Sequence, residues 1–528
     1  MQRHAKRAIR HRYVRLFWFF HEKQTTANDA LVDMAYPGRT QTVRLSTQKE
    51  RKTMAANYLH GVDTSEVERG PRQLHAVQSA VIGLVGAAPT GPVNQASQIG
   101  TEQDAALFGP ALAGFTIPQA LKAIHDHGVC PVIVINVLDP SIHKTQVPQE
   151  TLELNTRTDR ARLTHPAVAN LILTDAAGGT TYAEGTDYRL NALSGEIVRI
   201  ATGAIAVGAA LKASYDYADP SLITDVEIIG ALDVNNGTSS GLQALKTTSS
   251  LLGLEAKILI APGFCTQSSV AQSMVALATD LKAMTYLDAP IGATLQQVID
   301  GRDMDGAINF NTLSDRVRLC YPHVKVYDPA SKTEHLEPLS ARAAGLRARV
   351  DQDKGFWWSS SNQRLVGVTG LERPLPAHTD DPQSEINRLN AEGITTVLAS
   401  QDGFRLWGNR TAAWPTEPHP RHFEHVRRTS DLIDEAIRRL GQNHIDQPIN
   451  QALIDTLVES VERHGRMLIG KGAVSHFKAW FDPARNPDTQ LAEGHVLISY
   501  RYTPASVLER LSFETEIVSA CLTSLKGA

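Results

Sequence analysis

Two hydrophobic patterns alternate along most of the chain. Short continuous apolar runs are typical of strands buried on both faces of a parallel sheet, and apolar residues recurring every three or four positions are typical of helices that cover such a sheet. The runs that predict strands are residues 81–87, 131–137, 257–262, 284–289 and 324–327. The stretches that predict helices are residues 116–127, 239–252, 266–281 and 338–351. This alternation predicts an α/β fold with a mostly parallel sheet.

The alternation is interrupted between residues 146 and 222. Tyrosine and apolar residues occur there in short alternating stretches, which turn-forming pairs such as Gly178-Gly179 and Ser194-Gly195 separate. This pattern is typical of β-hairpins. Because surface loops tolerate insertions at a small entropic cost, we predict that residues 146–222 form an inserted β-rich domain.

Helical patterns dominate after residue 420. One helix is predicted from about residue 420 to 440, with Val426, Ile433 and Leu440 on its apolar face. A second helix is predicted at about residues 450–468. The closing strands described next make this region an α+β domain.

Both ends of the folded region carry strand-like stretches. Residues 496–504 and 508–518 alternate between apolar and polar positions, and residues 54–75 form a short extended-looking run. A terminal strand needs a neighbour to pair with, so we interpret the ends as arms. The predicted division is 1–53, an upstream extension; 54–75, an N-terminal arm; 76–145 and 223–400, two parts of the α/β domain; 146–222, the insertion; 401–511, a C-terminal α+β domain; and 512–528, a C-terminal arm.

The composition is that of a globular protein. The 528 residues suffice for about three domains, and the hydrophobic and charged shares of 42% and 20% are near average. No stretch reaches the roughly 18–20 apolar residues that span a bilayer. We therefore predict no membrane insertion.

Charge sets the first 53 residues apart. They hold 12 Lys or Arg and 4 Asp or Glu, in a chain whose formal net charge is −4. A nucleic-acid-binding arm, a signal peptide and sequence upstream of the natural start are the alternatives. Arg15 interrupts the apolar stretch, which disfavours a signal peptide, whereas the codons of Lys49-Glu50 can form a ribosome-binding sequence at a suitable distance from Met54. We predict that translation starts at Met54 and that residues 1–53 are disordered or absent from the natural protein.

Candidate chemistry is sparse. The glycines Gly83, Gly86 and Gly91 fit neither phosphate-binding pattern, and strand-turn packing explains them. His419, His422 and His425 recur every third position without an accompanying zinc-site pattern, and Lys471 between two glycines is interpreted as a helix-ending turn. The cysteines lack metal or redox spacing and are interpreted as reduced thiols: Cys130, Cys265, Cys320 and Cys521. We predict no catalytic, cofactor-binding or metal-ligating residue.

One charged surface stands out on the helix at 420–440. Its members are Arg427, Arg428, Asp431, Glu435, Arg438 and Arg439. A solvated helix face with pairs four residues apart is one interpretation. The other is a surface that contacts an acidic partner.

Several blocks in chain order resemble contractile phage tail sheath proteins, which also occur in phage-tail-like bacteriocins. They are residues 68–94, EGTDY and SGEIVRI within the insertion, residues 355–411, FEHVRRTSDLIDEAIRRL and LERLSFETEI. The resemblance covers nearly everything after Met54. It implies a structural subunit that polymerises around a tail tube and contracts to drive the tube through the host envelope.

The resemblance also implies a layered arrangement. The C-terminal domain faces the tube through the charged helix, the α/β domain lies outside it, and the insertion is outermost. The arms add strands to neighbouring subunits, which places Tyr58, Leu59, Val62, Phe513, Ile517 and Val518 at subunit contacts. The expected partners are further copies of the chain in a six-stranded helical polymer, the tube, baseplate and terminator proteins, with no nucleic acid. The expected location is the virion tail, assembled in the host bacterial cytoplasm.

The block at 355–411 is interpreted as the domain seam, the contact between the α/β body and the C-terminal domain. The expected seam residues are Trp357, Trp358, Arg364, Arg373, Trp407, Asn409 and Arg410. Large aromatic residues commonly fill such contacts. The alternatives are a nucleotide-using α/β enzyme and a sheath from a cell-borne contractile injection system.

Overall fold

The computed structural model describes residues 32–36, 39–43, 78–128, 130–329 and 331–517. It divides into two compact units, residues 1–73 and 74–528. In the first unit, β1 (Val32–Tyr36) and β2 (Arg39–Val43) form an antiparallel hairpin that the sequence did not predict. The predicted arm residues Tyr58, Leu59, Val62 and Val518, the proposed start at Met54, and Cys521 lie outside the described residues.

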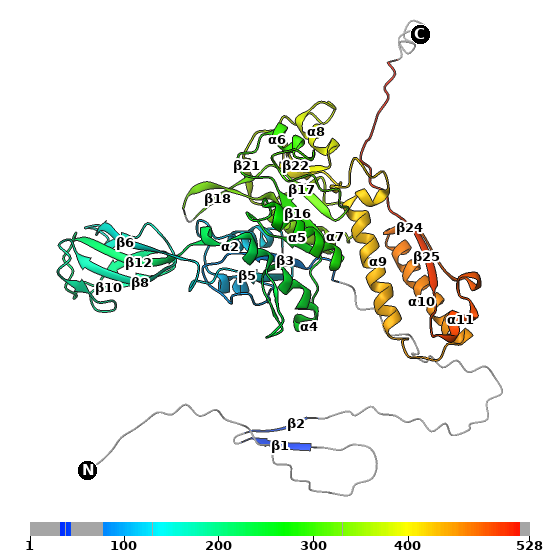
Figure 1. Cartoon of the computed structure of the whole chain (residues 1–528), viewed down its shortest axis with the longest axis horizontal. Helices are drawn as coiled ribbons and strands as arrows, with labels where there is room; N and C mark the ends of the chain where they lie inside the picture. The colour runs from blue at the N-terminus through cyan, green and yellow to red at the C-terminus, as the bar shows by residue number, and fades with distance from the viewer. Residues whose placement is uncertain (1–31, 37–38, 44–77, 129, 330, 518–528) are drawn as a thin grey trace. The chain divides into compact units, whose positions relative to one another are not determined.

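A nine-stranded mixed sheet forms the centre of the second unit, in the order β20-β23-β22-β17-β16-β15-β3-β5-β4 (Figure 1). Its six central strands are parallel: β3 (Ile82–Gly86), β5 (Val132–Asn136), β15 (Ile258–Ile260), β16 (Met284–Asp288), β17 (Val317–Cys320) and β22 (Ile394–Ser400). Antiparallel strands flank them: β4 (Ser97–Ile99), β20 (Gln363–Arg364) and β23 (Gly403–Trp407). The predicted α/β class is confirmed.

One predicted strand lies elsewhere, and two central strands were not predicted. The run at 324–327 forms β18 (Val324–Asp328), which pairs with β19 (Thr333–Glu337) and β21 (Val368–Leu371) in a separate three-stranded sheet. The two central strands that the pattern did not predict are β17 and β22. Arg318 interrupts the apolar pattern of β17, which is why the pattern missed it.

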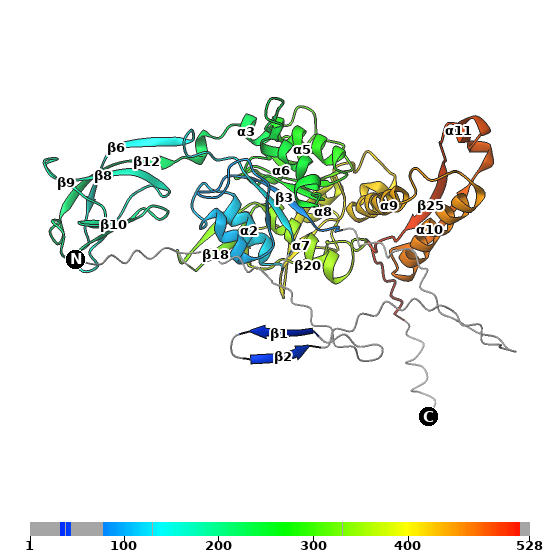
Figure 2. The same cartoon turned by 90° about the horizontal axis from the view of Figure 1, so that it is seen from below.

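Helices cover both faces of the central sheet. Successive strand residues point to opposite faces, so Val85 and Ile133 pack with η3 and α5, and Leu84 and Val134 pack with α2 and α7. Figure 2 places α5 and α7 on opposite sides of the sheet. The covering elements are α2 (Ile117–His125), η3 (Gly241–Thr247), α4 (Thr248–Leu252), α5 (Ser268–Asp280) and α7 (Leu339–Asp353). The single helix predicted at 239–252 is therefore a 3₁₀ turn followed by a short α-helix.

Shorter elements complete the α/β body. They are α1 (Glu102–Ala105), η1 (Ala106–Phe108), η2 (Pro220–Leu222), α3 (Asp225–Ile229), β13 (Leu232–Asp233), β14 (Thr238–Ser239), α6 (Leu295–Asp300), α8 (Glu385–Ala391) and η4 (Pro420–His422).

Seven strands fold between β5 and α3. A four-stranded sheet in the order β6-β12-β8-β9 accompanies a three-stranded sheet in the order β10-β11-β7. The strands are β6 (Lys144–Glu153), β7 (Arg160–Arg162), β8 (Val168–Asp175), β9 (Thr181–Tyr182), β10 (Tyr188–Asn191), β11 (Glu196–Arg199) and β12 (Ala210–Ala218). They enclose their own core, with Leu173, Ile197 and Tyr215 buried.

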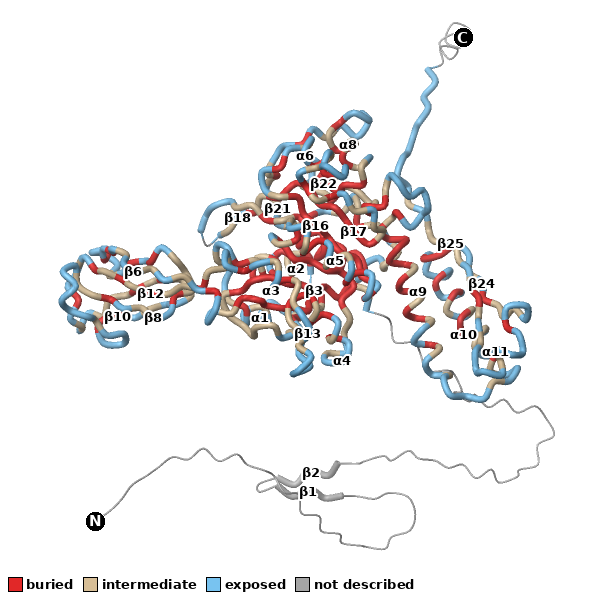
Figure 3. The backbone as a smooth tube through the Cα atoms, in the orientation of Figure 1, coloured by how far each residue is buried: buried red, intermediate tan, exposed pale blue. Residues whose placement is uncertain are grey.

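The last region consists of two long helices and a two-stranded sheet. The elements are α9 (Glu424–Gln442), α10 (Gln451–Gly470), β24 (Val474–Phe481), η5 (Pro483–Arg485), α11 (Asp488–Ala492) and β25 (Ile498–Pro504). β25 pairs with β24, a strand that the sequence did not predict. Residues 505–517, named the C-terminal segment, form no helix or strand, and Figure 3 shows their exposed trace leaving the packed body.

Candidate functional site

Helix α9 packs against the side of the body where the parallel strands begin (Figure 1). Glu424, Asp431 and Glu435 are seven and four residues apart, so they share one helix face. That face meets cations placed at the start of β15 and β17. The result is a buried ionic contact between α9 and the body, which is the seam as the structure has it.

The first part of the seam centres on Arg318 of β17. Its Nη1 lies 2.6 Å from Glu424 Oε2 and 2.7 Å from Ser360 Oγ. The hydroxyl of Tyr286 donates to the same carboxylate. Burial alone would raise the pKa of Glu424, but the guanidinium groups of Arg318, Arg347 and Arg428 outweigh it and lower that pKa to about 2. Glu424 is therefore ionised at neutral pH.

The second part centres on Asp431. Arg316, immediately before β17, holds this carboxylate with both guanidinium nitrogens, at 2.6 and 2.9 Å. Arg427 approaches it from the preceding helical turn at 2.7 Å and also reaches Asp315 at 3.4 Å. Two-nitrogen pairing fixes direction as well as distance, so it orients α9.

The third part lies nearer the end of α9. Lys257, immediately before β15, places its Nζ 2.8 Å from Glu435 Oε2 and 2.6 Å from Glu255 Oε2. Arg439 pairs with Glu435 from the next turn. Lys257 and Glu435 are buried, so this pair is shielded from solvent.

The fourth part joins α9 to α7. Asp351 at the end of α7 accepts from Arg347, with Arg347 Nη2 at 2.6 Å, and also pairs with Arg428 of α9. Arg347 Nη1 donates to the carbonyl oxygen of Trp358 at 2.6 Å, and Arg428 donates to that of Ser79 at 2.9 Å. Removing one partner of a buried pair leaves an uncompensated charge and costs about 3–5 kcal/mol.

These contacts correct the prediction for the charged face of α9. It was expected to be a surface, but Arg427, Arg428, Asp431 and Glu435 are all buried against the body. The physical reason is that Lys257, Arg316, Arg318 and Asp351 supply matching charges, which a single helix cannot reveal. Arg438 and Arg439 are exposed. The tube-facing role stays a prediction.

Two of the predicted seam residues in the block at 355–411, Trp357 and Asn409, contact α9 directly. Trp357 packs with Ile433 of α9 and Leu468 of α10. The carbonyl of Asn409 accepts from the backbone N–H of Glu424 at 3.0 Å. Arg410 contacts the C-terminal segment, as described below. This block therefore provides aromatic packing and backbone contacts, while the ion pairs come mostly from elsewhere.

The remaining members of the block lie differently. Trp407 packs against the core of the body, and the half-exposed ring of Trp358 lies under the Lys354 ammonium at 5.3 Å. Arg364 is exposed. Arg373 donates to the carbonyl of Gly292 at 2.9 Å, within the body. The structure thus does not bring Arg364 and Arg373 into the seam.

Arg410 anchors the start of the C-terminal segment. Its Nε and Nη2 lie 2.9 and 2.7 Å from the two carboxylate oxygens of Glu509. Its guanidinium carbon stacks 3.6 Å from the ring centroid of Trp414. Ala505 donates to the carbonyl of Ala473 at 3.3 Å, so the segment is held at both of these points.

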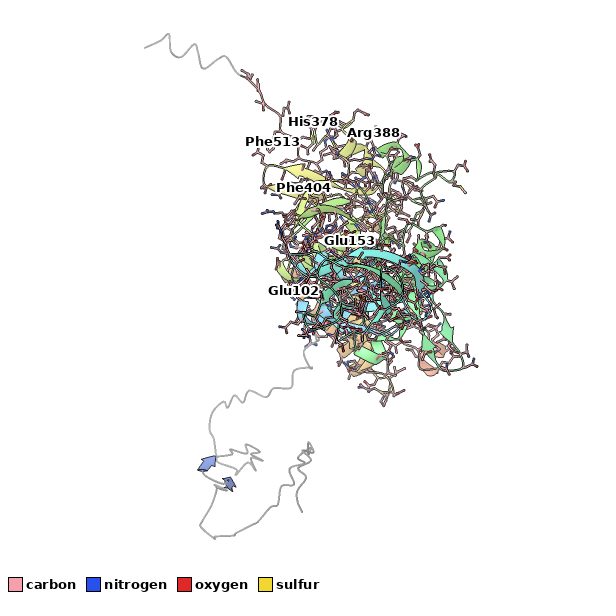
Figure 4. The ribbon with its side chains drawn as sticks, turned by 90° about the vertical axis from the view of Figure 1, so that its left-hand side faces the viewer. Glu102, Glu153, His378, Arg388, Phe404 and Phe513 are labelled. Atoms are coloured by element: carbon pink, nitrogen blue, oxygen red, sulfur yellow. The ribbon has the colours of Figure 1, made fainter. Side chains whose placement is uncertain are left out.

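Beyond Glu509 the contacts stop. Residues 510–517 have no hydrogen-bonding or ionic partner within the described part of the chain. Leu511, Phe513 and Ile517 are exposed by 61%, 84% and 95% of their surfaces. Figure 4 labels Phe513, which lies outside the packed body. Large apolar side chains exposed in this way mark a contact surface.

The sheet formed by β24 and β25 has two unlike faces. Phe477, Tyr500 and Tyr502 pack with Ile433 and Leu468 on the inner face. The opposite, outer face is polar and basic. Each strand pairs only with the other among the described residues, so each leaves one edge unpaired.

The other candidate groups have structural explanations. A Cβ at Gly86 would meet Thr116 Oγ1 at 2.3 Å, which supports close packing as the reason for that glycine. Among the described residues no three His, Cys, Asp or Glu side chains are arranged to hold a metal, and no helix could cross a membrane. Cys130, Cys265 and Cys320 are buried free thiols, and burial raises the pKa of Cys130 to about 12.

The sequence contained a signal for the seam that an analysis of apolar positions alone does not use. Lys257, Arg316 and Arg318 stand at or inside apolar strand runs. Cations are rarely buried unless they are paired, so a cation in such a run implies a carboxylate from another element.

Comparison with known proteins identifies the family. Residues 237–412 match the phage tail sheath protein central domain, and residues 416–518 match the phage tail sheath C-terminal domain. The tail sheath protein of Burkholderia phage BcepMu is 61% identical over 476 residues, which cover 90% of this chain and 100% of that protein. The chain belongs to the phage tail sheath family. The predicted resemblance is confirmed, and the chain is a contractile tail sheath subunit.

More distant sheath proteins agree. The tail sheath protein of Escherichia phage P2 is 30% identical over 298 residues, covering 56% of this chain and 72% of that protein. The contracted helical sheath of the anti-feeding prophage has the same fold, with a TM-score of 0.53 at 17% identity, covering 87% of this chain and 99% of that one. Residues 140–224, which include the β insertion, match a separate family of unknown function. Both sheath family matches lie C-terminal to this module.

Proposed function

We propose that the subunit polymerises helically around a tail tube and contracts to drive the tube through the host envelope. The observation that carries this is the contrast within one chain: α9 is fixed to the body by buried ion pairs, while residues 510–517 have no hydrogen-bonding or ionic partner among the described residues. A subunit built this way can move as one body and remain linked through its end.

The C-terminal segment supplies the link. Leu511, Phe513 and Ile517 alternate with polar residues, as in a strand with one apolar face. The unpaired edges of β24 and β25 offer backbone groups to such a strand. Addition of the segment to the sheet of a neighbouring subunit would bury its apolar side chains and satisfy both sets of backbone groups. Because the same contact repeats without closing, it generates a filament.

The layers follow the family. The C-terminal domain lies nearest the tube, the α/β body outside it and the insertion at the exterior. The separate family match of residues 140–224 supports an addition that the sheath proper does not require. The exposed Arg438 and Arg439 are the part of the α9 prediction that remains available for tube contact.

Contraction needs no cofactor in this proposal. Assembly traps the subunits in an extended packing, and triggering by the baseplate releases them into one of lower free energy. Strand linkage keeps neighbours connected during the change. Six strands and contact with a terminator protein remain expectations drawn from the family.

Truncation tests the link. A chain ending at Glu509 should fold as the full chain does but form no sheath, which electron microscopy of the purified protein would show as particles without tubes. A matched truncation at Ser519 keeps residues 510–517 and should still form tubes. Tubes of ordinary length from the chain that ends at Glu509 would refute the link.

A further inference from the structure

The outer face of the β24–β25 sheet carries an unusual pair. Lys478 and Arg501 are directly opposite each other in the strand register. Like charges at opposite positions repel and destabilise a sheet. Both side chains are exposed, and the guanidinium carbon of Arg501 lies 5.6 Å from the ring centroid of Trp480 on the same face.

A third cation reinforces this charge. Arg485 donates to Ser499 Oγ at 3.0 Å, and Ser499 is opposite Trp480 on the outer face. Within the described part of the chain, Lys478, Arg501 and Arg485 have no ion-pair partner. The nearby carboxylate of Asp482 accepts from the N–H of Ala484, capping a short helical turn. The face therefore has uncompensated positive charge.

The C-terminal segment carries two carboxylates and one cation, Arg510, on one side of its alternation. Its apolar positions are Leu511, Phe513 and Ile517, and the intervening positions include Glu514 and Glu516. In a strand these two sets point to opposite faces. Glu509 is held by Arg410 of its own subunit, so the pairing carboxylates begin beyond that anchor.

We propose that Glu514 and Glu516 of one subunit bind the basic outer face of a second copy and thereby select the facing and register of the added strand. This proposal rests on the proposed strand linkage and adds the charges that determine how the strand is oriented and aligned. With Phe513 and Ile517 toward the apolar inner face, the two glutamates lie on the side of Lys478, Arg485 and Arg501. Neighbouring strands are about 4.8 Å apart, so either free edge brings them within reach.

The charges disfavour a strand that is shifted by one residue. A one-residue slip would turn Glu514 and Glu516 toward the apolar inner face and Phe513 toward the cations. Carboxylates on an apolar face without partners are costly, so the slipped register is rejected. The repulsion between Lys478 and Arg501 persists in the free subunit and is relieved only when the correct strand arrives.

Charge reversal in matched pairs tests this. Lys478→Glu with Arg501→Glu should reduce the sedimentable sheath polymer at least tenfold, and so should Glu514→Lys with Glu516→Lys. All four changes together should restore polymer to within about threefold of the unaltered chain, because the attraction is re-formed with its sign exchanged. Lys122→Glu with Lys471→Glu is the control, since it changes the net charge equally at exposed sites elsewhere.

Each other outcome counts against the proposal. Either double reversal polymerising normally, the fourfold variant failing to recover, or the control losing polymer would overturn it. Loss of tube binding with tube-free polymer unaffected in Lys478→Glu with Arg501→Glu would assign the face to an acidic tube surface instead. The chain ending at Glu509 distinguishes the strand linkage from its selection by charge. If this truncated chain still polymerises, the strand linkage itself is wrong. If the truncated chain fails and the charge-reversal variants polymerise, the linkage stands and the selection by charge is wrong.

Discussion

The seam under α9 and the C-terminal segment differ in whether their side chains have partners within the subunit. Every carboxylate of the seam meets at least one cation, and most of the participating groups are buried. Beyond Glu509, the apolar and acidic side chains of residues 510–517 have no partner in the part of the chain that the structure describes. The seam pairs its carboxylates with cations of the same chain, whereas we propose that the segment pairs its carboxylates in another molecule.

This difference separates stability from assembly. Buried ion pairs fix geometry because removal of either partner is costly. An exposed segment contributes little to the fold of its own subunit, since it buries almost nothing there. A change in the seam should therefore alter folding, and a change in the segment should alter polymerisation.

Arg318→Met should have the largest effect on folding. It leaves Glu424 buried without its closest cation, and we expect the free energy of unfolding to fall by about 3–5 kcal/mol. Denaturant titration measures this. Arg364→Met, at an exposed site, should change it by less than about 0.5 kcal/mol. Equal losses of unfolding free energy in the two variants would contradict the claim that seam residues stabilise the fold more than exposed residues do.

Much of the body was predictable, and most of the seam was not. Continuous apolar runs identified β3, β5, β15 and β16 because burial on both faces leaves that pattern. The role of the charged face of α9 could not be derived from α9 alone. The helix sequence does not show whether Glu424 and Asp431 contact water or contact Arg318 and Arg316. The alternation of the segment suggested an arm because a strand needs a neighbour to pair with, and that role stays a prediction.

Acid should weaken the seam next. The pKa of Glu424 lies at about 2 in the folded chain, below its ordinary value of 4.5. A lowered folded pKa gives stability that is present above 4.5 and is lost as pH falls towards 2. Glu424→Gln should therefore be less stable than the unaltered chain at pH 6, and the gap should narrow as pH falls through this range. Thermal melts at successive pH values measure the gap, and a constant gap would contradict the ionised buried pair.

Packing between α2 and α7 should matter less than the loss of Arg318. A Cβ at Gly345 would lie 2.8 Å from the Cα and carbonyl oxygen of Ile124. Backbone cannot give way as a flexible side chain can, so Gly345→Ala should cost about 1–3 kcal/mol. Gly441→Ala is the matched control, because nothing lies within 4 Å of the added Cβ. Both changes should leave polymerisation of the folded fraction intact.

Arg410→Ala should have the smallest effect on folding. The pair with Glu509 is partly exposed, so its loss should cost at most about 1 kcal/mol. Its consequence is positional, because the segment would leave the body several residues earlier. Limited proteolysis should then cut residues 505–509 faster, while cleavage elsewhere is unchanged. Unaltered cleavage of these residues would show that Ala505 alone anchors the segment.

Hydrogen exchange of free subunits and assembled sheath tests the central claim most directly. The amides of α9 should be protected in both states, and those of residues 510–517 should exchange freely in the subunit and become protected in the sheath. Amides of 510–517 that stay unprotected in the sheath, or α9 amides that gain protection only on assembly, would contradict it.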